Sequence, residues 1–535
     1  MNGPRWFTDW LQQQDPFVLV PFFGYMIGVF VIAVIAHRYL KEAEFESEYY
    51  VGGRNFGAWV LAMSWVATMA SGGTFLGYPS LIYSYGWSMA FWVSGSTITA
   101  IAGLGIIGKR INRLARQTGA LTLVDLLRDR YDSRTVGVVY AVLIIVLTTV
   151  YLTAQFMAGA RILENILGTS YFMGLLLFSV SVVAYTTYGG FRAVAWTDTL
   201  QGIVMIVGIV LLVPFAVSKV GGLEKATANL MHRQDPIAAE KGLPSRTNSY
   251  LYPPGPEKIT KTPTTGDQAP RSQPWLPIGM GMSLFLLRGI GAVLMPTTVP
   301  RMLAFKDTKA LRKALLLLAP YLLLMYGSSL ITMNCAFSLN LGLDPRQSDQ
   351  AVPELARAVA PQFLAGILIA APFAAVMSTV DSALLVVSAS FVRDLLQKTY
   401  VPNLSTNATR RLSYLATALT GVVVFFIARE ERPFLLPLVI HFTGGAASVL
   451  FWPSLATLFW RRATRQGVLA GLIGGALVYI GAVVFDPFGN LVRLHPFMYG
   501  FPTSALLVAI GSFMSPKQTD IRLDIYFGRN PQAGR

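Results

Sequence analysis

About 13 apolar stretches, each near the roughly 20 residues that a membrane-spanning helix needs, recur along the chain and limit its fold more than any other feature. Runs such as 141–149, 174–184 and 202–216 contain no charged residue. Apolar residues make up 53% of the chain and charged residues 13%, whereas about 25% is usual for soluble proteins. The pattern predicts an all-α polytopic membrane protein. The expected spans lie near 17–38, 57–85, 87–108, 135–163, 170–188, 193–217, 276–300, 315–341, 362–392, 411–428, 433–460, 466–486 and 494–514.

Lys and Arg residues gather in alternate connecting segments. If the N-terminus is outside, the inner segments hold 27 of them, with Arg301 counted as a loop residue, and the short outer loops hold 6. Positive charge accumulates on the cytoplasmic side of membrane proteins. We therefore expect an outer N-terminus, a cytoplasmic C-terminus and residence in a bacterial inner membrane. The net charge of +16 is then an orientation signal and no sign of nucleic-acid binding.

Few charges remain inside the expected spans, and they are the main site candidates. They include Arg288, Asp198 and Asp381, and charges at membrane depth usually face a cavity and mark function. Ser378, Asp381 and Ser382 are spaced i, i+3 and i+4, which places them on one helical face. Three oxygen-bearing side chains on one face suit a small alkali cation. Arg288 has no acid within one turn, so we expect it to face a substrate cavity.

Two spans contain helix-breaking residues at corresponding places. Ser71-Gly72-Gly73 interrupts the second span, and Gly289, Gly291 and Pro296 interrupt the seventh, five spans later. A repeat of five spans is odd in number, so its second copy is inverted in the membrane. Interrupted helices in two inverted halves are typical of a transporter with its binding site at the midplane.

Five sequence motifs carry a family resemblance. With them the chain resembles the sodium:solute symporter family, and most of all its pantothenate branch. The resemblance runs from about residue 49 to residue 516 and implies a leucine-transporter-type core of two inverted five-helix repeats with broken helices. The motifs are Tyr-Tyr-Val-Gly-Gly-Arg at 49–54, the broken helix at 62–79, and the segments 189–201, 306–310 and 370–379.

The resemblance also implies a sodium site and an exit route for the ion. Sodium would bind the backbone carbonyls of Ala67, Ala70 and Ala375 and the hydroxyls of Ser378 and Thr379. Asp198 matches a family aspartate on the inner exit route, and some relatives have a second sodium site that here would use Asp198, Asp381 and Ser382. Substrate candidates at the breaks and on the neighbouring span are Ser71, Gly72, Gln155, Arg288 and Pro296.

We therefore expect a sodium-coupled importer of a small organic solute, and no enzyme, because the sequence contains no nucleophile–base constellation. An unpaired Arg288 favours a solute with a carboxylate group. Pantothenate is the first candidate, and pyruvate, lactate or acetate are the next. The alternatives are an amino-acid symporter, a proton-coupled carrier that uses Asp381, and, in a different class, a channel or membrane sensor. We expect a monomer in the lipid bilayer, with sodium as coupling ion and no cofactor.

The expected division of the chain follows from the spans. An extra N-terminal helix with its inner loop (1–56) precedes the first five-helix repeat (57–217). A long outer loop (218–275), rich in Pro, Thr, Ser and Lys and expected to be partly disordered, leads to the second repeat (276–460). Two C-terminal helices and a short cytoplasmic tail (461–535) follow.

Overall fold

The computed structural model describes residues 16–38, 44–232, 248–252, 255–259, 272–274, 276–343, 345–430, 436–485, 494–518 and 522–528. Within these ranges the chain is almost entirely helical. Ten helices are long and apolar enough to cross a membrane, and two shorter apolar helices, Ala58–Met69 and Ile278–Leu294, accompany them. The predicted all-α membrane fold is confirmed.

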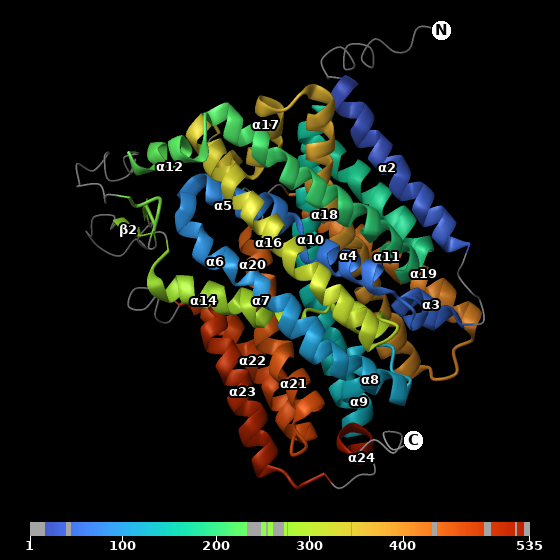
Figure 1. Ribbon diagram of the computed structural model, residues 1–535. Coiled ribbons are helices and arrows are strands. Elements are labelled where there is room, and N and C mark those ends of the chain that lie inside the picture. The colour runs from blue at the N-terminus through green and yellow to red at the C-terminus, as the bar shows by residue number, and fades with distance from the viewer. Residues whose placement is uncertain are drawn as a thin grey trace.

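The helices follow one another in two groups, one in each half of the chain (Figure 1). The first half contains α2 (Pro16–His37), α3 (Phe45–Val51), α4 (Ala58–Met69), α5 (Tyr78–Tyr85), α6 (Ala90–Ser94), α7 (Ser96–Ala100), α8 (Lys109–Thr118), α9 (Leu123–Tyr131), α10 (Arg134–Leu167), α11 (Tyr171–Val220) and α12 (Leu223–Met231). Strands β1 (Glu257–Ile259) and β2 (Ser272–Pro274) follow. The second half contains α14 (Ile278–Gly289), α15 (Val299–Ala304), α16 (Thr308–Leu339), α17 (Ala351–Val359), α18 (Gln362–Ala389), α19 (Thr406–Ala428), α20 (Leu436–Ala446), α21 (Trp452–Phe459), α22 (Arg465–Phe485), α23 (Phe497–Met514) and α24 (Arg522–Phe527).

Two neighbouring stretches that the sequence separates, 170–188 and 193–217, meet in the single element α11 at Gly190. This residue has φ +61° and ψ −174°, a left-handed φ that favours glycine. A Cβ there would lie 2.6 Å from Cδ2 of Tyr49. The chain therefore turns sharply between two helices at Gly190. The helical stretch 73–118 likewise joins the second part of the second expected span to the third, and the count of 13 stays a prediction.

The short helices α9 and α17 reveal the inverted relation of the two halves. Each has nine residues, and each stands between the second and third long segments of its half. Figure 1 shows α17 at one end of the bundle, beside α12, and α9 at the opposite end, beside α8 and α24. Equivalent elements at opposite ends are what an inverted repeat requires.

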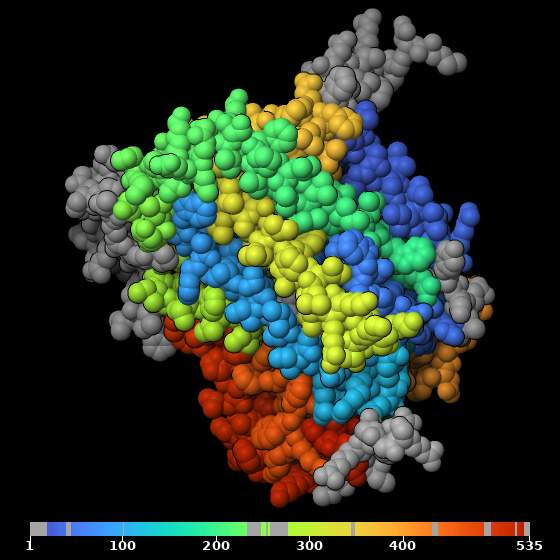
Figure 2. Space-filling view, in the orientation of Figure 1, coloured from blue at the N-terminus to red at the C-terminus, as the bar shows by residue number. Residues whose placement is uncertain are grey.

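Helices α11 and α18 form the centre of the bundle and pack on each other. Within an 18-residue apolar stretch of the α18 span, 83% of the residues are buried, which is why the apolar run there is nearly continuous. Segments from the two halves also lie side by side at the surface, where α16 packs on α5 and α7 (Figure 2). Large apolar side chains on the outer helices, such as Leu316 and Leu323, point outwards, as lipid contact requires.

The segment 218–275 contains regular secondary structure in the parts that the structure describes. Helix α12 packs against α16, and β1 pairs antiparallel with β2, with Lys258 opposite Gln273. Residues 233–247, 253–254, 260–271 and 275 of this loop lie outside the described ranges.

Candidate functional site

The first broken helix opens its backbone where the sequence places a sodium site. Helix α4 ends at Met69, and Ala70 adopts φ −83° and ψ 85°, outside the helical region. The chain re-enters a helical conformation at Gly72 and continues as the π-helical turn Gly73–Gly77. Carbonyl groups in the last turn of a helix have no partner within it. The break therefore leaves carbonyl oxygens of α4 available for other contacts.

Helix α18 brings two hydroxyl groups to this break. The hydroxyl of Ser378 donates to the carbonyl oxygen of Ala67 at 2.7 Å and lies 3.1 Å from that of Ala375. The hydroxyl of Thr379 donates to the same Ala375 oxygen at 2.9 Å. All four residues are fully buried. Four of the five residues expected to bind sodium are thus brought together, and the fifth, Ala70, lies at the adjacent break.

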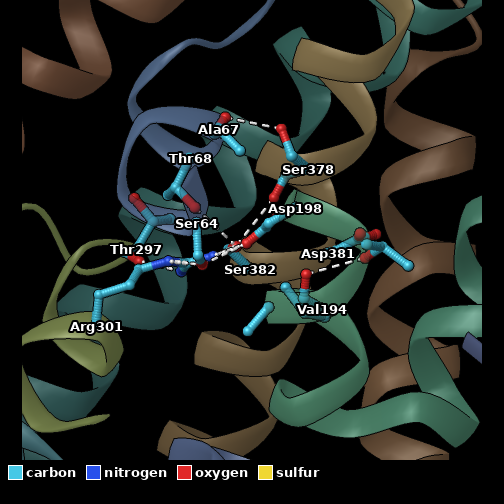
Figure 3. A network of polar contacts seen from close by, with 12 residues as sticks. Ser64, Ala67, Thr68, Val194, Asp198, Thr297, Arg301, Ser378, Asp381 and Ser382 are labelled. Carbon is cyan, nitrogen blue, oxygen red and sulfur yellow. Dashed lines mark hydrogen bonds and ion pairs between the residues drawn. The ribbon is translucent and has the colours of Figure 1, made fainter. Parts of the chain in front are cut away.

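A buried ion pair lies one helical turn from this cluster. One terminal nitrogen of Arg301 lies 2.7 Å from Oδ2 of Asp198 and donates to the hydroxyl of Ser382, also at 2.7 Å. Its Nε donates to the hydroxyl of Ser64 at 2.9 Å, and its other terminal nitrogen donates to the carbonyl of Thr297 at 2.9 Å. Figure 3 shows these side chains converging from four segments.

The position of Arg301 corrects the sequence analysis, which counts it as a loop charge. Its side chain is fully buried, because α15 is the second half of the broken seventh span and continues into the protein interior after Pro300. Without Arg301, the segments that the charge count assigns to the inside hold 26 Lys and Arg residues, against 6 in the short loops assigned to the outside. The available signal was the break itself, since a half-helix that follows a break at membrane depth starts inside the protein.

Asp381 belongs to a different set of contacts. Its Oδ1 accepts hydrogen bonds from the hydroxyls of Tyr185 at 2.5 Å and Thr186 at 2.8 Å, both on α11. Its Oδ2 has no hydrogen-bond partner among the described residues. Figure 3 shows Asp381 apart from the group around Arg301. Of the three residues expected at a second cation site, Asp198 and Ser382 thus share Arg301, and Asp381 faces elsewhere.

The substrate candidates at the first break are adjacent. The side-chain oxygen of Gln155 accepts a hydrogen bond from the backbone N–H of Gly72 at 2.9 Å, and its Nε2 is buried with no partner among the described residues. Ser71, the next candidate, is buried and neighbours Tyr151. Pro296 lies farther along, in a cavity whose lining includes neither Gln155 nor Ser71.

Arg288 lies on α14 among hydroxyl and aromatic groups. Its Nε donates to Ser96 at 3.2 Å, a terminal nitrogen donates to the hydroxyl of Tyr326 at 3.4 Å, and the guanidinium lies 5.1 Å from the ring centroid of Tyr78. The side chain is buried, and no carboxylate of a described residue forms an ion pair with it. The sequence did not single out Tyr78 or Tyr326, because aromatic residues are common in apolar spans.

An ion network joins α3, α9 and the end of the α18 span at the α9 end of the bundle. Nε of Arg393 lies 2.9 Å from Oδ2 of Asp125, and the same guanidinium contacts Glu46. Asp125 also contacts Arg128 and accepts the N–H of Leu121 at 3.0 Å. Burial opposes the ionisation of Asp125, but the two arginines outweigh it and hold the pKa of this carboxyl below its ordinary value.

Comparison with known sequences agrees with the resemblance argued from motifs. The sequence model of the sodium:solute symporter family matches residues 49–475. The sodium/pantothenate symporter of Escherichia coli K12 is 33% identical over 503 residues, which cover 92% of this chain and 96% of that protein. The sodium/pantothenate symporter of Haemophilus influenzae is 32% identical, with 86% and 90% covered, and its sodium/proline symporter is 28% identical, with 93% and 95% covered.

Comparison with solved structures supports the fold. A Na⁺-coupled sialic acid symporter in a substrate-bound, outward-open state superposes with a TM-score of 0.74 at 20% identity, covering 95% of this chain and 99% of that one. Mhp1, a nucleobase-cation-symport-1 family transporter, superposes with a TM-score of 0.55 at 13% identity, covering 89% and 97%. The inverted-repeat architecture is therefore shared with both.

Proposed function

Since the chain belongs to the sodium:solute symporter family, we propose that it imports a small monocarboxylate together with sodium. Pantothenate is the first candidate, and the names of two relatives at 32% and 33% identity support it. The related candidates are pyruvate, lactate and acetate. An amino acid is the next class, which the 28% identical sodium/proline symporter supports.

The observation that carries the carboxylate assignment is the environment of Arg288. A buried guanidinium without a carboxylate partner is costly in a membrane interior, and a bound carboxylate would compensate its charge through two hydrogen bonds. Tyr78 and Tyr326 lie against this group. Near the first break, the amide N–H₂ of Gln155 has no hydrogen-bond partner among the described residues and is suited to a hydroxyl or carbonyl oxygen of the solute.

Sodium binding would be coupled to solute binding through the two helices that the ion joins. Ala67 belongs to broken α4, whereas Ala375, Ser378 and Thr379 belong to buried α18. These carbonyl and hydroxyl oxygens fit sodium, which needs hard oxygen ligands, and the unwound backbone at Ala70 adds one more. An ion bound there would hold α4 against α18. Solute and sodium would then favour the same conformation, which is coupling by differential affinity.

We place the α9 end of the bundle in the cytoplasm and the N-terminus outside. Basic residues at the α9 end, including Arg110, Arg116, Arg128 and Arg130, support this orientation. The chain would work as a monomer in a bacterial inner membrane. Release of sodium and solute would then occur towards α9, past Asp198.

A proton-coupled carrier is the second candidate, and the contacts of Asp381 favour it. This carboxyl is fully buried, accepts two hydroxyl hydrogen bonds and forms no direct ion pair with a described residue. Such a group can carry a proton through a transport cycle. A channel or a membrane sensor would lack a saturable, ion-coupled solute flux.

Thermal stabilisation of the purified protein tests these candidates together. Ligands that bind only the folded state raise its stability by RT ln(1 + [L]/Kd). We expect pantothenate or another monocarboxylate to stabilise the protein in sodium but not in potassium. If stabilisation by a carboxylate depends on pH but not on the presence of sodium, proton coupling through Asp381 would be favoured. Stabilisation by neutral solutes alone would exclude the carboxylate assignment.

A further inference from the structure

Helix α24 packs on both α8 and α9 at the α9 end of the bundle (Figure 1). The hydroxyl of Tyr526 donates to the carbonyl oxygen of Leu126 in α9 at 2.8 Å. The carbonyl oxygen of Tyr526 accepts a hydrogen bond from a terminal nitrogen of Arg110 in α8 at 2.6 Å. The side chain of Tyr526 is buried, so a single residue of α24 joins the two helices.

The ring of Phe527 lies against two arginines, one from each of these helices. Its centroid is 4.7 Å from the guanidinium carbon of Arg130 in α9 and 5.4 Å from that of Arg110 in α8. Aromatic faces attract cations within about 6 Å. Both arginines also donate to carbonyl oxygens at the end of α21, those of Leu458 and Trp460. Helix α24 therefore closes a junction at which α8, α9 and α21 meet.

The two guanidinium groups repel each other across this junction. Neither forms an ion pair with a described residue. The described acids of the region contact other arginines, namely Asp125 and Asp129 with Arg128, Asp132 with Arg522, and Asp524 with Arg461. The ring of Phe527 and the carbonyl of Tyr526 thus help to hold two like charges of α8 and α9 near each other.

Helices α8 and α9 are attached to different parts of the bundle. Asn112 of α8 donates to the carbonyl oxygens of Leu303 and Phe305, at the end of half-helix α15, at 3.0 and 3.2 Å. The chain just before α4 pairs with the chain around the end of α15 through two backbone hydrogen bonds of 3.1 Å. By contrast, Thr122, next to α9, donates to Asp394 in the continuation of α18 at 2.7 Å. Helix α8 should therefore move with α4 and α15, and α9 with α18.

We propose that α24 holds the α9 end of the bundle closed by joining α8 to α9. The proposal rests on the proposed sodium-coupled transport, in which loss of sodium frees α4 from α18 and thereby lets α8 separate from α9. Opening of this end then requires that α24 release one of the two helices. The connection 119–122 permits the movement, since Gly119 has φ +75° and its Cβ position has no neighbour within 4 Å.

The reactivity of a cysteine in the cavity at the α9 end tests the proposal. Ala389 is buried and lines this cavity together with residues of α9, so Ala389→Cys in a Cys335→Ala background should react with a maleimide only when this end opens. The assay uses the purified, full-length protein. We expect Phe527→Ala to raise the labelling rate about 5- to 30-fold, the factor that corresponds to two lost cation–π contacts. Ile525→Ala is the matched control, because this side chain lies on the same helix and is 45% exposed.

A second variant and the melting temperatures separate opening from unfolding. Tyr526→Phe keeps the ring and removes only the hydrogen bond to Leu126, so we expect a smaller rise at an unchanged melting temperature. Equal labelling rates in Phe527→Ala and Ile525→Ala, or slower labelling in Phe527→Ala, would overturn the proposal and leave sodium-coupled transport intact. Failure of sodium to slow the labelling of the unmodified protein would instead refute the proposed coupling, and the comparison of variants would still decide the role of α24.

Discussion

Replacing Arg288 with Gln removes the charge that we propose binds the solute carboxylate. The structure gives Arg288 neutral partners, namely the hydroxyls of Ser96 and Tyr326 and the ring of Tyr78, so the fold loses about 1 kcal/mol for each hydrogen bond that Gln does not replace. The bound carboxylate loses hydrogen bonds to a charged group, worth about 1.5–3 kcal/mol. At about 1.4 kcal/mol per factor of ten, the KM for carboxylate uptake should rise roughly 10- to 150-fold.

The assay is sodium-driven uptake of labelled pantothenate into proteoliposomes, with the melting temperature of each variant measured in parallel. The KM of Arg288→Lys should lie between those of the unmodified protein and Arg288→Gln, because lysine keeps the charge and loses the planar, bidentate geometry. Arg357→Gln is the matched control, since Arg357 forms a pair with Glu354 on α17 in which both side chains are about one third exposed. The amide analogue of the solute should bind unmodified protein and Arg288→Gln equally weakly.

An unchanged KM in a well-folded Arg288→Gln variant would refute the reasoning. So would equal binding of the carboxylate and its amide analogue by the unmodified protein. In either case the guanidinium would serve the packing of α14, and the solute class would have to be sought among neutral molecules.

Three further predictions concern the proposed sodium site, the ion network at the α9 end of the bundle and the turn at Gly190 in α11. Ser378→Ala should weaken sodium binding at least tenfold, because it removes a hydroxyl within reach of the Ala67 carbonyl. The dependence of the melting temperature on sodium concentration measures this affinity, and an unchanged affinity would exclude Ser378 as a ligand. The pKa of Asp125 lies below its ordinary value, so this residue stabilises the folded state above its unfolded-state pKa, and that contribution is lost as the pH falls through its folded-state pKa. Arg393→Gln should reduce the loss, which melting curves between pH 3 and 7 would show. Gly190→Ala should lower stability by more than about 1 kcal/mol, because φ is +61° there; an unchanged melting temperature would contradict this.

The membrane fold could be predicted from the sequence because apolar periodicity and helix breaks are local properties. The sequence also indicated the cluster of Ala67 and Ser378, since a family resemblance fixes positions along the chain. It did not reveal that Arg301 is buried, because the seventh expected span ends at residue 300 and Arg301 was therefore counted with the connecting segment that follows. Nor could the sequence show that Asp381 and Ser382 have different contact partners, since neighbours on one helical face can contact different helices.

Because α9 and α17 lie at opposite ends of the bundle, the two ends have a similar backbone. They differ in the strength of the ion pairs that hold each end together. At the α9 end, Arg393 and Asp125 form a buried ion network, whereas at the α17 end the pair of Arg357 and Glu354 is about one third exposed. Leaving one charge of a buried pair without its partner costs about 3–5 kcal/mol, whereas an exposed pair contributes about 0–1 kcal/mol. Without ligands, the molecule should therefore be open at its α17 end and closed at its α9 end. A few side chains then account for the different behaviour of two ends whose backbone architecture is symmetric.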